Sequence, residues 1–378
     1  MKNVIGLYIH IPFCMSKCHY CDFNSFSGME GSIPGYFDAL KKEICLYEDM
    51  LKDYEIKTVF IGGGTPSYVH ESYIVEVMNL CNEKLNICEN GEISIESNPG
   101  TLDPHKLSAY RKAGVNRLSI GLQARQDHIL KRIGRIHCSG DFDISFYNAR
   151  EAGFKNINTD LIFGLPGQKL SDWKETIESI VGLGVEHVSC YSLKIEEGTV
   201  FGNMLDIGEI SYIDDELDRE MYSRAVEYLT SNGYRHYEIS NFAKPGFECR
   251  HNLVYWNAEP YIGVGAGAHS YFQGKRTNNI NSVEEYVKSI GKGEIPGENT
   301  GYINKDDEIS EYMILGLRLI EGVSAKKFFK RFDTDIFDKY GKRLDKLVKD
   351  GLLDVEEDKI RLTTKGLDLA NRVFVEFI

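Results

Sequence analysis

Hydrophobic and polar residues follow a repeating order over the first two thirds of the chain. Short runs rich in β-branched and aliphatic residues, typical of strands, alternate with longer stretches whose apolar residues recur three and four positions apart, typical of one helix face. Phe37, Leu40, Ile44, Tyr47 and Leu51 form one such face. This alternation predicts an α/β fold with a parallel sheet, either doubly wound or curved into a barrel. The predicted strands are Ile5–Ile11, Thr58–Gly62, Glu92–Glu96, Arg117–Leu122, Asn158–Phe163, His187–Leu193 and Arg235–Ile239.

The segments that follow these predicted strands are rich in glycine, proline and polar residues. In parallel α/β folds the chemistry lies at the carboxyl ends of the strands, in the loops that lead to the helices. Turn formation alone explains any one such loop, but five in succession favour a functional site. The loops contain Pro12-Phe13-Cys14, Gly62-Gly63-Gly64-Thr65-Pro66, Glu96-Ser97-Asn98-Pro99, Gln123 and Gly164-Leu165-Pro166-Gly167.

The pattern changes after residue 272. Residues 273–304 are rich in Gly, Asn and Lys, with one helical patch at Val283–Ile290, and they are interpreted as a linker. Residues 305–378 show two helical patterns, a hairpin pattern and a last helix, which predict a small helical, winged-helix-like domain. We therefore expect a main domain at 1–272, a linker at 273–304 and a C-terminal domain at 305–378.

The charge of the chain argues against nucleic-acid binding. With 44 Lys and Arg against 57 Asp and Glu, the formal net charge is −13, whereas a general nucleic-acid binder presents a basic face. Residues 301–378 contain 15 basic and 16 acidic residues, a weak electrostatic footprint for phosphate contacts. A packing or docking role is therefore favoured for the C-terminal domain.

Cysteine usage and the N-terminus both favour the cytoplasm. Nine cysteines, an odd number in a long chain, disfavour a disulfide framework and favour a metal centre with scattered reduced thiols. Met1–Phe13 has no small-residue cleavage site. No apolar stretch is long enough for a membrane span. We therefore expect a soluble, cytoplasmic protein.

Cys14, Cys18 and Cys21 form a CxxxCxxC motif in the loop after the first predicted strand. Zinc requires four ligands, and His19 is a poorly spaced candidate for the fourth. Iron–sulfur clusters are held by thiolates, and three ligands on a 4Fe–4S cluster would leave one iron open to an external chelating molecule. The other cysteines in helical or strand patterns are expected to be buried, small apolar residues: Cys45, Cys81, Cys88, Cys138 and Cys190.

This motif, with an aromatic residue just before its third cysteine, resembles the radical S-adenosylmethionine (SAM) superfamily. The resemblance implies a partial (β/α)6 barrel, a 4Fe–4S cluster with one open iron, and SAM bound to that iron through its amino and carboxylate groups. An electron from the cluster can then cleave SAM to a 5′-deoxyadenosyl radical, so the cofactors carry the chemistry and the protein positions them.

Residues in the later loops match SAM-contacting positions of the coproporphyrinogen-oxidase-like branch of this superfamily. The glycine-rich element allows a ligand to approach the backbone closely, a carboxylate suits hydroxyls or an amine, and arginine suits a carboxylate. Two tyrosines match positions near the cluster, although core packing also explains them. The resemblance assigns to SAM Tyr8, Tyr20, Gly63, Gly64, Thr65, Glu96, Gln123, Arg135 and Asp160.

A second glycine-rich segment, at residues 263–268, only superficially suggests a dinucleotide fingerprint. It does not open a βαβ unit with an acidic residue downstream. It matches instead the segment of the same branch that precedes Ala268-His269-Ser270.

Two features place the chain within the branch. Coproporphyrinogen dehydrogenases carry a further cysteine two residues past the third cluster cysteine, where this chain has Phe23. The segment from Cys249 to Trp256 contains HNxxYW, a signature of the heme chaperones of this branch. The resemblance implies that heme binds near His251 and is delivered to heme-dependent respiratory proteins, with an electron donor serving the cluster.

The residues themselves leave the heme contacts open. Histidine is a common axial ligand, but His251 also suits an ordinary loop or core position. Cys249 is a rival ligand, Arg250 could meet a propionate, and Tyr255 and Trp256 could line a porphyrin face.

Three functional classes follow. The first is a heme chaperone. The second is a radical enzyme acting on a tetrapyrrole, either as an oxygen-independent coproporphyrinogen III dehydrogenase or as a related methyltransferase or heme-opening enzyme. The third, a DNA-binding regulator, is disfavoured by charge. No catalytic residue is assigned, and the sequence leaves open whether SAM is cleaved in function and whether the chain forms a homodimer.

Overall fold

Six parallel strands form the centre of the protein in a computed structural model, which describes residues 3–378 apart from the side chains of residues 298–300. Each strand pairs with the next in parallel, so the predicted parallel α/β fold is confirmed. The six strands are β1 (Asn3–Ile11), β2 (Tyr54–Gly63), β3 (Ile87–Ser97), β4 (Arg117–Gln123), β5 (Ile157–Phe163) and β6 (His187–Ser192).

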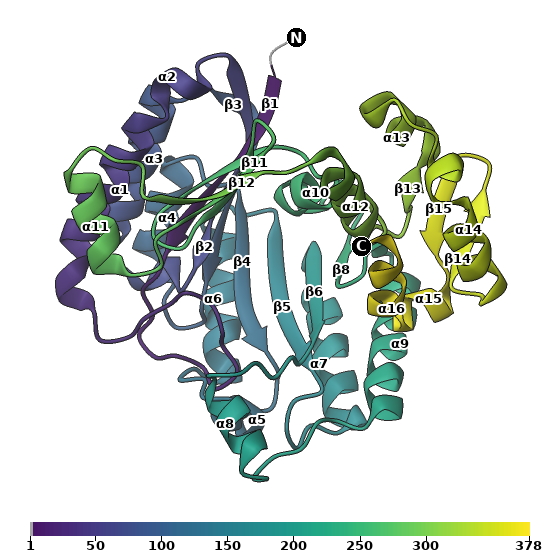
Figure 1. Cartoon of the computed structure of the whole chain (residues 1–378). Coiled ribbons are helices and arrows are strands. Elements are labelled where there is room, and N and C mark those ends of the chain that lie inside the picture. Colours follow the sequence, from purple (N-terminus) through teal and green to yellow (C-terminus); the bar gives the residue numbers. More distant parts are fainter. Residues whose placement is uncertain (1–2) are drawn as a thin grey trace.

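Most of the helices that follow these strands along the chain cover one face of the sheet, and two short ones lie at one end of it (Figure 1). The apolar face predicted from Phe37 to Leu51 is divided between two helices at Tyr47. The helices are α1 (Ile33–Leu46), α2 (Glu48–Leu51), α3 (Glu71–Lys84), α4 (Pro104–Lys112), α5 (Asp127–Arg132), α6 (Ser139–Glu151), α7 (Leu170–Leu183), α8 (Val200–Asp206) and α9 (Asp215–Ser231).

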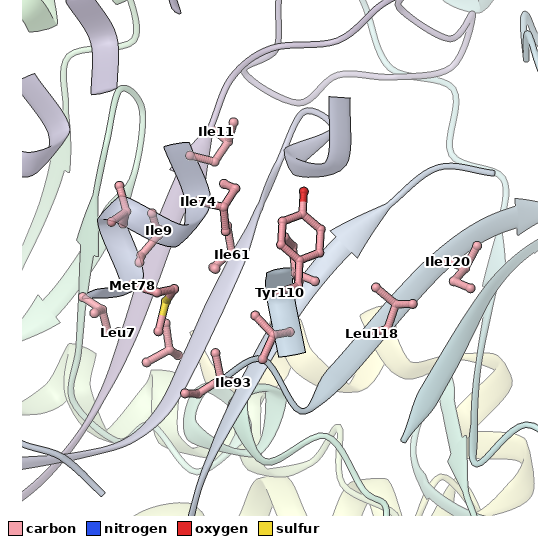
Figure 2. Packing of buried hydrophobic residues seen from close by; sticks show 14 of the residues in the cluster. Leu7, Ile9, Ile11, Ile61, Ile74, Met78, Ile93, Tyr110, Leu118 and Ile120 are labelled. Carbon is pink, nitrogen blue, oxygen red and sulfur yellow. The ribbon is translucent and has the colours of Figure 1, made fainter. Parts of the chain in front are cut away.

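The main core lies between the sheet and these helices. Alternate residues of β1, including Ile9 and Ile11, pack with Ile74 and Met78 of α3 (Figure 2). The residues between them point to the opposite face, because successive side chains in a strand alternate. Tyr8 is such a residue, so the inner face of the sheet is free to carry polar and aromatic side chains.

The sheet continues beyond the six strands at both edges and does not close within residues 3–378. Its order is β12-β11-β10-β9-β1-β2-β3-β4-β5-β6-β8-β7, so the barrel is partial. The predicted strand Arg235–Ile239 exists as β7, but β7 and β8 are antiparallel additions to β6. The added elements are β7 (Arg235–Glu238), β8 (Asn241–Ala243), α10 (Arg250–Trp256), β9 (Tyr261–Val264), β10 (His269–Phe272), β11 (Lys275–Asn279), α11 (Val283–Gly291) and β12 (Gly297–Tyr302).

The segment interpreted as a linker, residues 273–304, instead extends the sheet. β11 pairs with β10 and β12, and α11 buries Val283, Tyr286 and Ile290. Polar contacts connect this segment to α1. The Tyr286 hydroxyl of α11 and the Asn279 amide of β11 both donate to the buried Glu43 carboxyl. Much of the Gly, Asn and Lys content lies within the strands β11 and β12, while the apolar face of α11 provides the packing.

A second hydrophobic core belongs to the C-terminal domain. There a small antiparallel sheet of order β13-β15-β14 forms the wing. The domain docks on the barrel through backbone hydrogen bonds from Ile239 N to Arg318 O and from Ile320 N to Tyr237 O, both 3.1 Å. Its elements are α12 (Lys305–Gly316), β13 (Val323–Ser324), α13 (Ala325–Phe332), α14 (Ile336–Lys349), β14 (Leu353–Glu356), β15 (Lys359–Leu362), α15 (Thr364–Asp368) and α16 (Ala370–Phe374).

Burial of the remaining cysteines differs from the prediction. Cys81 and Cys190 are buried, but Cys45 and Cys138 are exposed and Cys88 is partly exposed. Cys45 lies on the solvent side of α1 beside the buried Ile44, and Cys138 stands at the start of α6.

Among the helices of the described chain, none combines the length and apolar character that a membrane crossing needs.

Candidate functional site

The loops at the carboxyl ends of β1 to β5 bring the predicted cluster and SAM residues to one end of the barrel. A cavity of about 790 Å3 opens there. Tyr8 and Glu96 line it from inside the barrel, Gly63 lines it from the glycine-rich loop, and Phe23 and His269 line its mouth. The Phe23 side chain is 62% exposed, so the position at which the dehydrogenases carry a cysteine faces the cavity entrance.

The loop carrying Cys14, Cys18 and Cys21 is closed at its base by the main chain. Cys14 N donates to Phe26 O over 2.9 Å, and Phe26 N donates to Pro12 O over 2.7 Å. The Lys17 ammonium donates to the carbonyls of Phe23 and Ser25 at 3.0 and 3.2 Å. These contacts hold the three cysteines on one short, folded-back segment.

Burial raises the pKa of the Cys14 and Cys21 thiols, and the nearby thiols raise it further. Thiolates are the form that binds metal, so loading this loop must release protons. Within residues 3–378, no three His, Cys, Asp or Glu side chains are grouped tightly enough for a single metal ion. Three thiolates from one loop are the donor chemistry that iron–sulfur clusters use. His19, the rival zinc ligand, has Nδ1 3.0 Å from Arg132 O.

A hydrogen-bonded series joins Cys14, at the start of the cysteine loop, to Tyr20, near its end, through three other loops. Cys14 Sγ lies 3.5 Å from Thr65 Oγ1, to which the Asn98 amide donates over 3.0 Å. The Arg135 guanidinium then donates to Asn98 Oδ1 over 2.7 Å and to the Tyr20 hydroxyl over 2.9 Å. Thr65, Arg135 and Tyr20, which the sequence assigned to the site, are therefore brought together with the first cysteine.

Asn98 belongs to this series but was not among the site residues predicted from the sequence. Its only signal was its place in the polar loop after the third strand, and no spacing rule distinguished it from Ser97. The structure also leaves Arg135 Nε buried without a protein partner among the described residues. A buried, unpartnered donor of this kind suits an anionic or carbonyl group of a ligand.

The glycine-rich loop at the end of β2 packs closely against neighbouring atoms, and this packing requires glycine at Gly63 and Gly64. Gly63 has φ +112°, a conformation that favours glycine, and its amide donates to Glu96 Oε2 over 3.0 Å. A Cβ on Gly64 would lie 2.7 Å from Phe13 O and 3.0 Å from Cys14 Sγ. The glycine-rich loop therefore touches both the cysteine loop and the acidic interior.

Glu96 on β3 and Asp160 on β5 lie on the inner face of the barrel. Burial, together with the neighbouring Asp160, raises the pKa of Glu96 to about 8. Asp160 accepts hydrogen bonds from Ser119 Oγ at 2.7 Å and from Asn158 Nδ2 at 2.9 Å. SAM carries a sulfonium and an amino group, and this acidic pair is complementary to such positive charge.

Gln123 and Arg135 converge above Gly121. A Cβ on Gly121 would lie 2.8 Å from Gln123 Nε2 and 3.2 Å from an Arg135 nitrogen. Gln123 itself has φ +71°, an uncommon conformation for a residue with a side chain. Strained conformations of this kind are concentrated at functional sites.

A buried polar series connects Asp160 to the start of α10. The Asn158 side chain contacts Asp160 and also His187 Nδ1, and His187 Nε2 lies 2.8 Å from the Tyr237 hydroxyl. Cys249 N donates to that hydroxyl over 3.3 Å. No local sequence pattern predicts this connection, because its members come from three strands and a loop.

His251 on α10 is buried, at 1% exposed, and both ring nitrogens have partners. Nδ1 lies 2.9 Å from Thr58 Oγ1, and Nε2 lies 2.9 Å from the Tyr255 hydroxyl. Burial lowers the pKa of His251 to about 3, so the ring is neutral near pH 7. An iron bond to His251 would therefore have to replace one of these two hydrogen bonds.

Stacked rings place His251 in one row with the predicted SAM residue Tyr8. The Phe60 ring lies between them, with centroids 5.2 Å from His251 and 6.3 Å from Tyr8. The Tyr8 hydroxyl lies 2.9 Å from His10 Nδ1.

The first turn of α10 is fixed by Glu92, whose carboxylate accepts a hydrogen bond from the amide of His251 over 3.0 Å.

Comparison with known proteins agrees with this geometry. A model described as "Radical SAM superfamily" matches residues 8–180, and one described as "HemN C-terminal domain" matches residues 303–369. Over the whole chain, the solved structure of the coproporphyrinogen III oxidase HemN from Escherichia coli superposes with a TM-score of 0.87 at 24% identity, covering 90% of that chain. This likeness confirms the α/β radical SAM fold with its C-terminal domain.

Curated relatives match over nearly the full length. "Heme chaperone HemW" of Bacillus subtilis (strain 168) is 40% identical, with 98% of each chain covered. The proteins of that name from Lactococcus lactis and Escherichia coli (strain K12) are 36% and 33% identical, with 98% and 99% of this chain covered. Radical SAM membership implies a 4Fe–4S cluster and SAM. By its full-length identity with these relatives, the chain belongs to the HemW family of the radical SAM superfamily.

Proposed function

We propose that this chain is a cytoplasmic heme chaperone, which binds heme and delivers it to heme-dependent respiratory proteins. The proposal rests on its 40% identity, over 98% of both chains, with a protein named heme chaperone HemW. Two local features support it. Phe23 stands at the cavity mouth in place of the dehydrogenase cysteine, and the HNxxYW segment forms a helix against the barrel.

In this proposal the cysteine loop and the surrounding loops hold the cofactors. Cys14, Cys18 and Cys21 bind a 4Fe–4S cluster, and an external electron donor reduces it. When bound, the reduced cluster supplies an electron that can cleave SAM. The buried Arg135 Nε and the Gly63 backbone suit a ligand with a carboxylate and a flexible chain. The SAM-binding residues are Tyr8, Tyr20, Gly63, Gly64, Thr65, Glu96, Gln123, Arg135 and Asp160.

His251 is the proposed axial ligand of the heme iron when Tyr255 moves away from Nε2. Tyr255 lines the cavity, which gives its side chain a place to move. Neutral imidazole is the form that binds iron, and the lowered pKa of His251 keeps the ring neutral.

Heme titration of anaerobically reconstituted protein tests this function. We expect saturable binding, with a heme spectrum that changes in His251→Ala, and transfer of heme to an apo-form of a respiratory heme protein. Unchanged affinity and spectrum in His251→Ala would remove the axial ligand assignment. Absence of heme binding in the reconstituted wild-type protein would contradict the chaperone function itself.

A radical enzyme acting on a tetrapyrrole is the second candidate, supported by the retained cysteine loop and SAM-site residues. The assay follows 5′-deoxyadenosine release with coproporphyrinogen and, separately, with heme. We expect no product in stoichiometric amount from either tetrapyrrole. Stoichiometric product would establish the enzyme and contradict a function limited to chaperoning.

A further inference from the structure

The helix α10 has two faces that serve different parts of the molecule. His251 and Tyr255 face the barrel, where His251 is buried and Tyr255 lines the cavity described above. Arg250, Leu253 and Trp256, spaced three residues apart, line a second hollow between α10 and the C-terminal domain. Residues three apart lie on one side of a helix, so the HNxxYW segment separates the barrel cavity from this interdomain groove.

The interdomain groove has a volume of about 790 Å3, within the range of about 300–1,000 Å3 that buries a small-molecule ligand. Its walls combine aliphatic side chains of the C-terminal domain with the rings of Trp256 and Tyr312. The Arg318 guanidinium lies over Trp256, 4.4 Å from the ring centroid. Trp256 Nε1 is buried without a partner among the residues described. The groove thus offers flat aromatic surface on the partly exposed rings of Trp256 and Tyr312.

More cationic than acidic residues line this groove, although the chain as a whole carries −13. Three of the five cations pair with carboxylates in the structure, which leaves Arg250 and Lys327 as the two without a carboxylate partner among the described residues. The Arg250 guanidinium donates to the carbonyls of Asn90 and Lys57, not to a carboxylate. Lys327 forms no salt bridge with any carboxylate that the structure describes. The cations are Arg235, Arg250, Lys327, Lys359 and Arg361, and the acids are Glu248 and Glu321.

We propose that the interdomain groove is a tetrapyrrole site, in which the ring lies against Trp256 and the two propionates meet Arg250 and Lys327. This inference rests on the proposed function and adds a second position for the cargo, on the side of α10 away from His251. A planar, apolar dianion matches both properties of the groove, because its ring covers aromatic and aliphatic walls while its carboxylates pair with Arg and Lys. An acidic peptide would match the charge but would leave the aromatic wall unfilled.

Binding in the groove uses the ring and the carboxylates, so it does not require iron. The probes are therefore heme, metal-free protoporphyrin IX, and the dimethyl ester of protoporphyrin IX, which lacks the negative charges. Binding is followed by quenching of tryptophan emission. The chain has two tryptophans, and Trp173 is fully buried with its indole donating to Met221 O. The part of the quenching that is lost in Trp256→Phe therefore measures binding in the groove.

We expect metal-free protoporphyrin IX to bind and to quench Trp256, and the dimethyl ester to bind more weakly. The double variant Arg250→Gln/Lys327→Gln should weaken protoporphyrin and heme binding about tenfold, because two charge-assisted contacts are lost. Lys342→Gln/Lys349→Gln, which removes two exposed charges on α14, is the matched control and should leave both affinities unchanged.

Other outcomes would contradict the assignment of the groove as a tetrapyrrole site and would leave the proposed function unaffected. If heme binds but metal-free protoporphyrin does not, the contact is made through iron and the groove is not the site. Equal affinity of the double variant and the wild-type protein, or equal affinity for the diester and the diacid, also contradicts the groove. Failure of wild-type protein to bind heme at all would instead contradict the chaperone function.

Discussion

The Arg135 guanidinium donates a hydrogen bond to the Tyr20 hydroxyl over 2.9 Å. Tyr20 stands between the second and third cysteines of the cysteine loop, and Arg135 lies between α5 and α6. Because Arg135 also binds Asn98, which reaches Thr65 and Cys14, one side chain connects both ends of the cysteine loop. This arrangement couples the position of the thiols to the residues assigned to SAM.

Removing the Arg135 guanidinium should loosen that arrangement. In Arg135→Leu, the buried Tyr20 hydroxyl and Asn98 carbonyl lose a charged partner, and a lost hydrogen bond to a charged group costs about 1.5–3 kcal/mol. We expect lower iron and sulfide content after reconstitution and weaker SAM binding by equilibrium dialysis. Lys131→Gln on the exposed surface of α5 is the control. Full cluster content in Arg135→Leu would show that the series does not position the thiols.

Gly64→Ala tests the close approach of the two loops. The added methyl would stand 2.7 Å from Phe13 O, so backbone must shift, and overpacking costs about 1–3 kcal/mol. The free energy of unfolding from urea titration should fall by that amount, and reconstituted iron content should fall with it. Gly341→Ala in α14 meets no atom within 4 Å and should be neutral or slightly stabilising. Equal behaviour of the two variants would refute the steric argument.

Serine replacements should distinguish the three loop cysteines, as ligands of the cluster, from the other cysteines of the chain. Cys14→Ser, Cys18→Ser and Cys21→Ser should each lose most of the bound iron, because a hydroxyl is a poor substitute for a thiolate ligand. Cys88→Ser lies outside the loop and should keep wild-type iron. Iron and sulfide analysis after anaerobic reconstitution is the measurement. Loss of iron in Cys88→Ser would mean that the cluster has a further ligand.

The pH dependence of stability should report on Glu96. Its pKa is about 8 in the folded protein against 4.5 in the unfolded chain, so between these values the folded state holds a proton that the unfolded state has released. The free energy of unfolding therefore falls as pH rises from 4.5 to 8, by up to about 1.4 kcal/mol per pH unit from this group.

Glu96→Gln should flatten that slope in the protein without SAM and should weaken SAM binding. Urea titrations at several pH values compare it with the wild-type protein and with Glu151→Gln, an exposed carboxyl on α6. The control should keep the wild-type slope. A slope in Glu96→Gln equal to that of the wild-type protein would show that Glu96 is ionised in the fold throughout this range.

Most of the barrel could be predicted from local patterns. The runs that form β1 to β6 were recognisable because buried parallel strands are short and nearly continuous in apolar residues. β11 and β12 were not, since Lys275–Asn279 and Gly297–Tyr302 contain mainly polar residues and glycine. Their pairing depends on an existing sheet edge, which no local pattern reveals.

The amino-acid sequence by itself determined the order of strands and helices, the spacing of the three cysteines and the polar loop after each strand. These features are local, so periodicity and spacing are sufficient to detect them. Only the tertiary structure decided that Asn98 joins the site, that His251 is buried with both nitrogens bonded, and that Arg250 and Lys327 line one groove. Each of these relationships joins residues far apart in the chain, and they become neighbours only when the sheet curves and the C-terminal domain docks against α10.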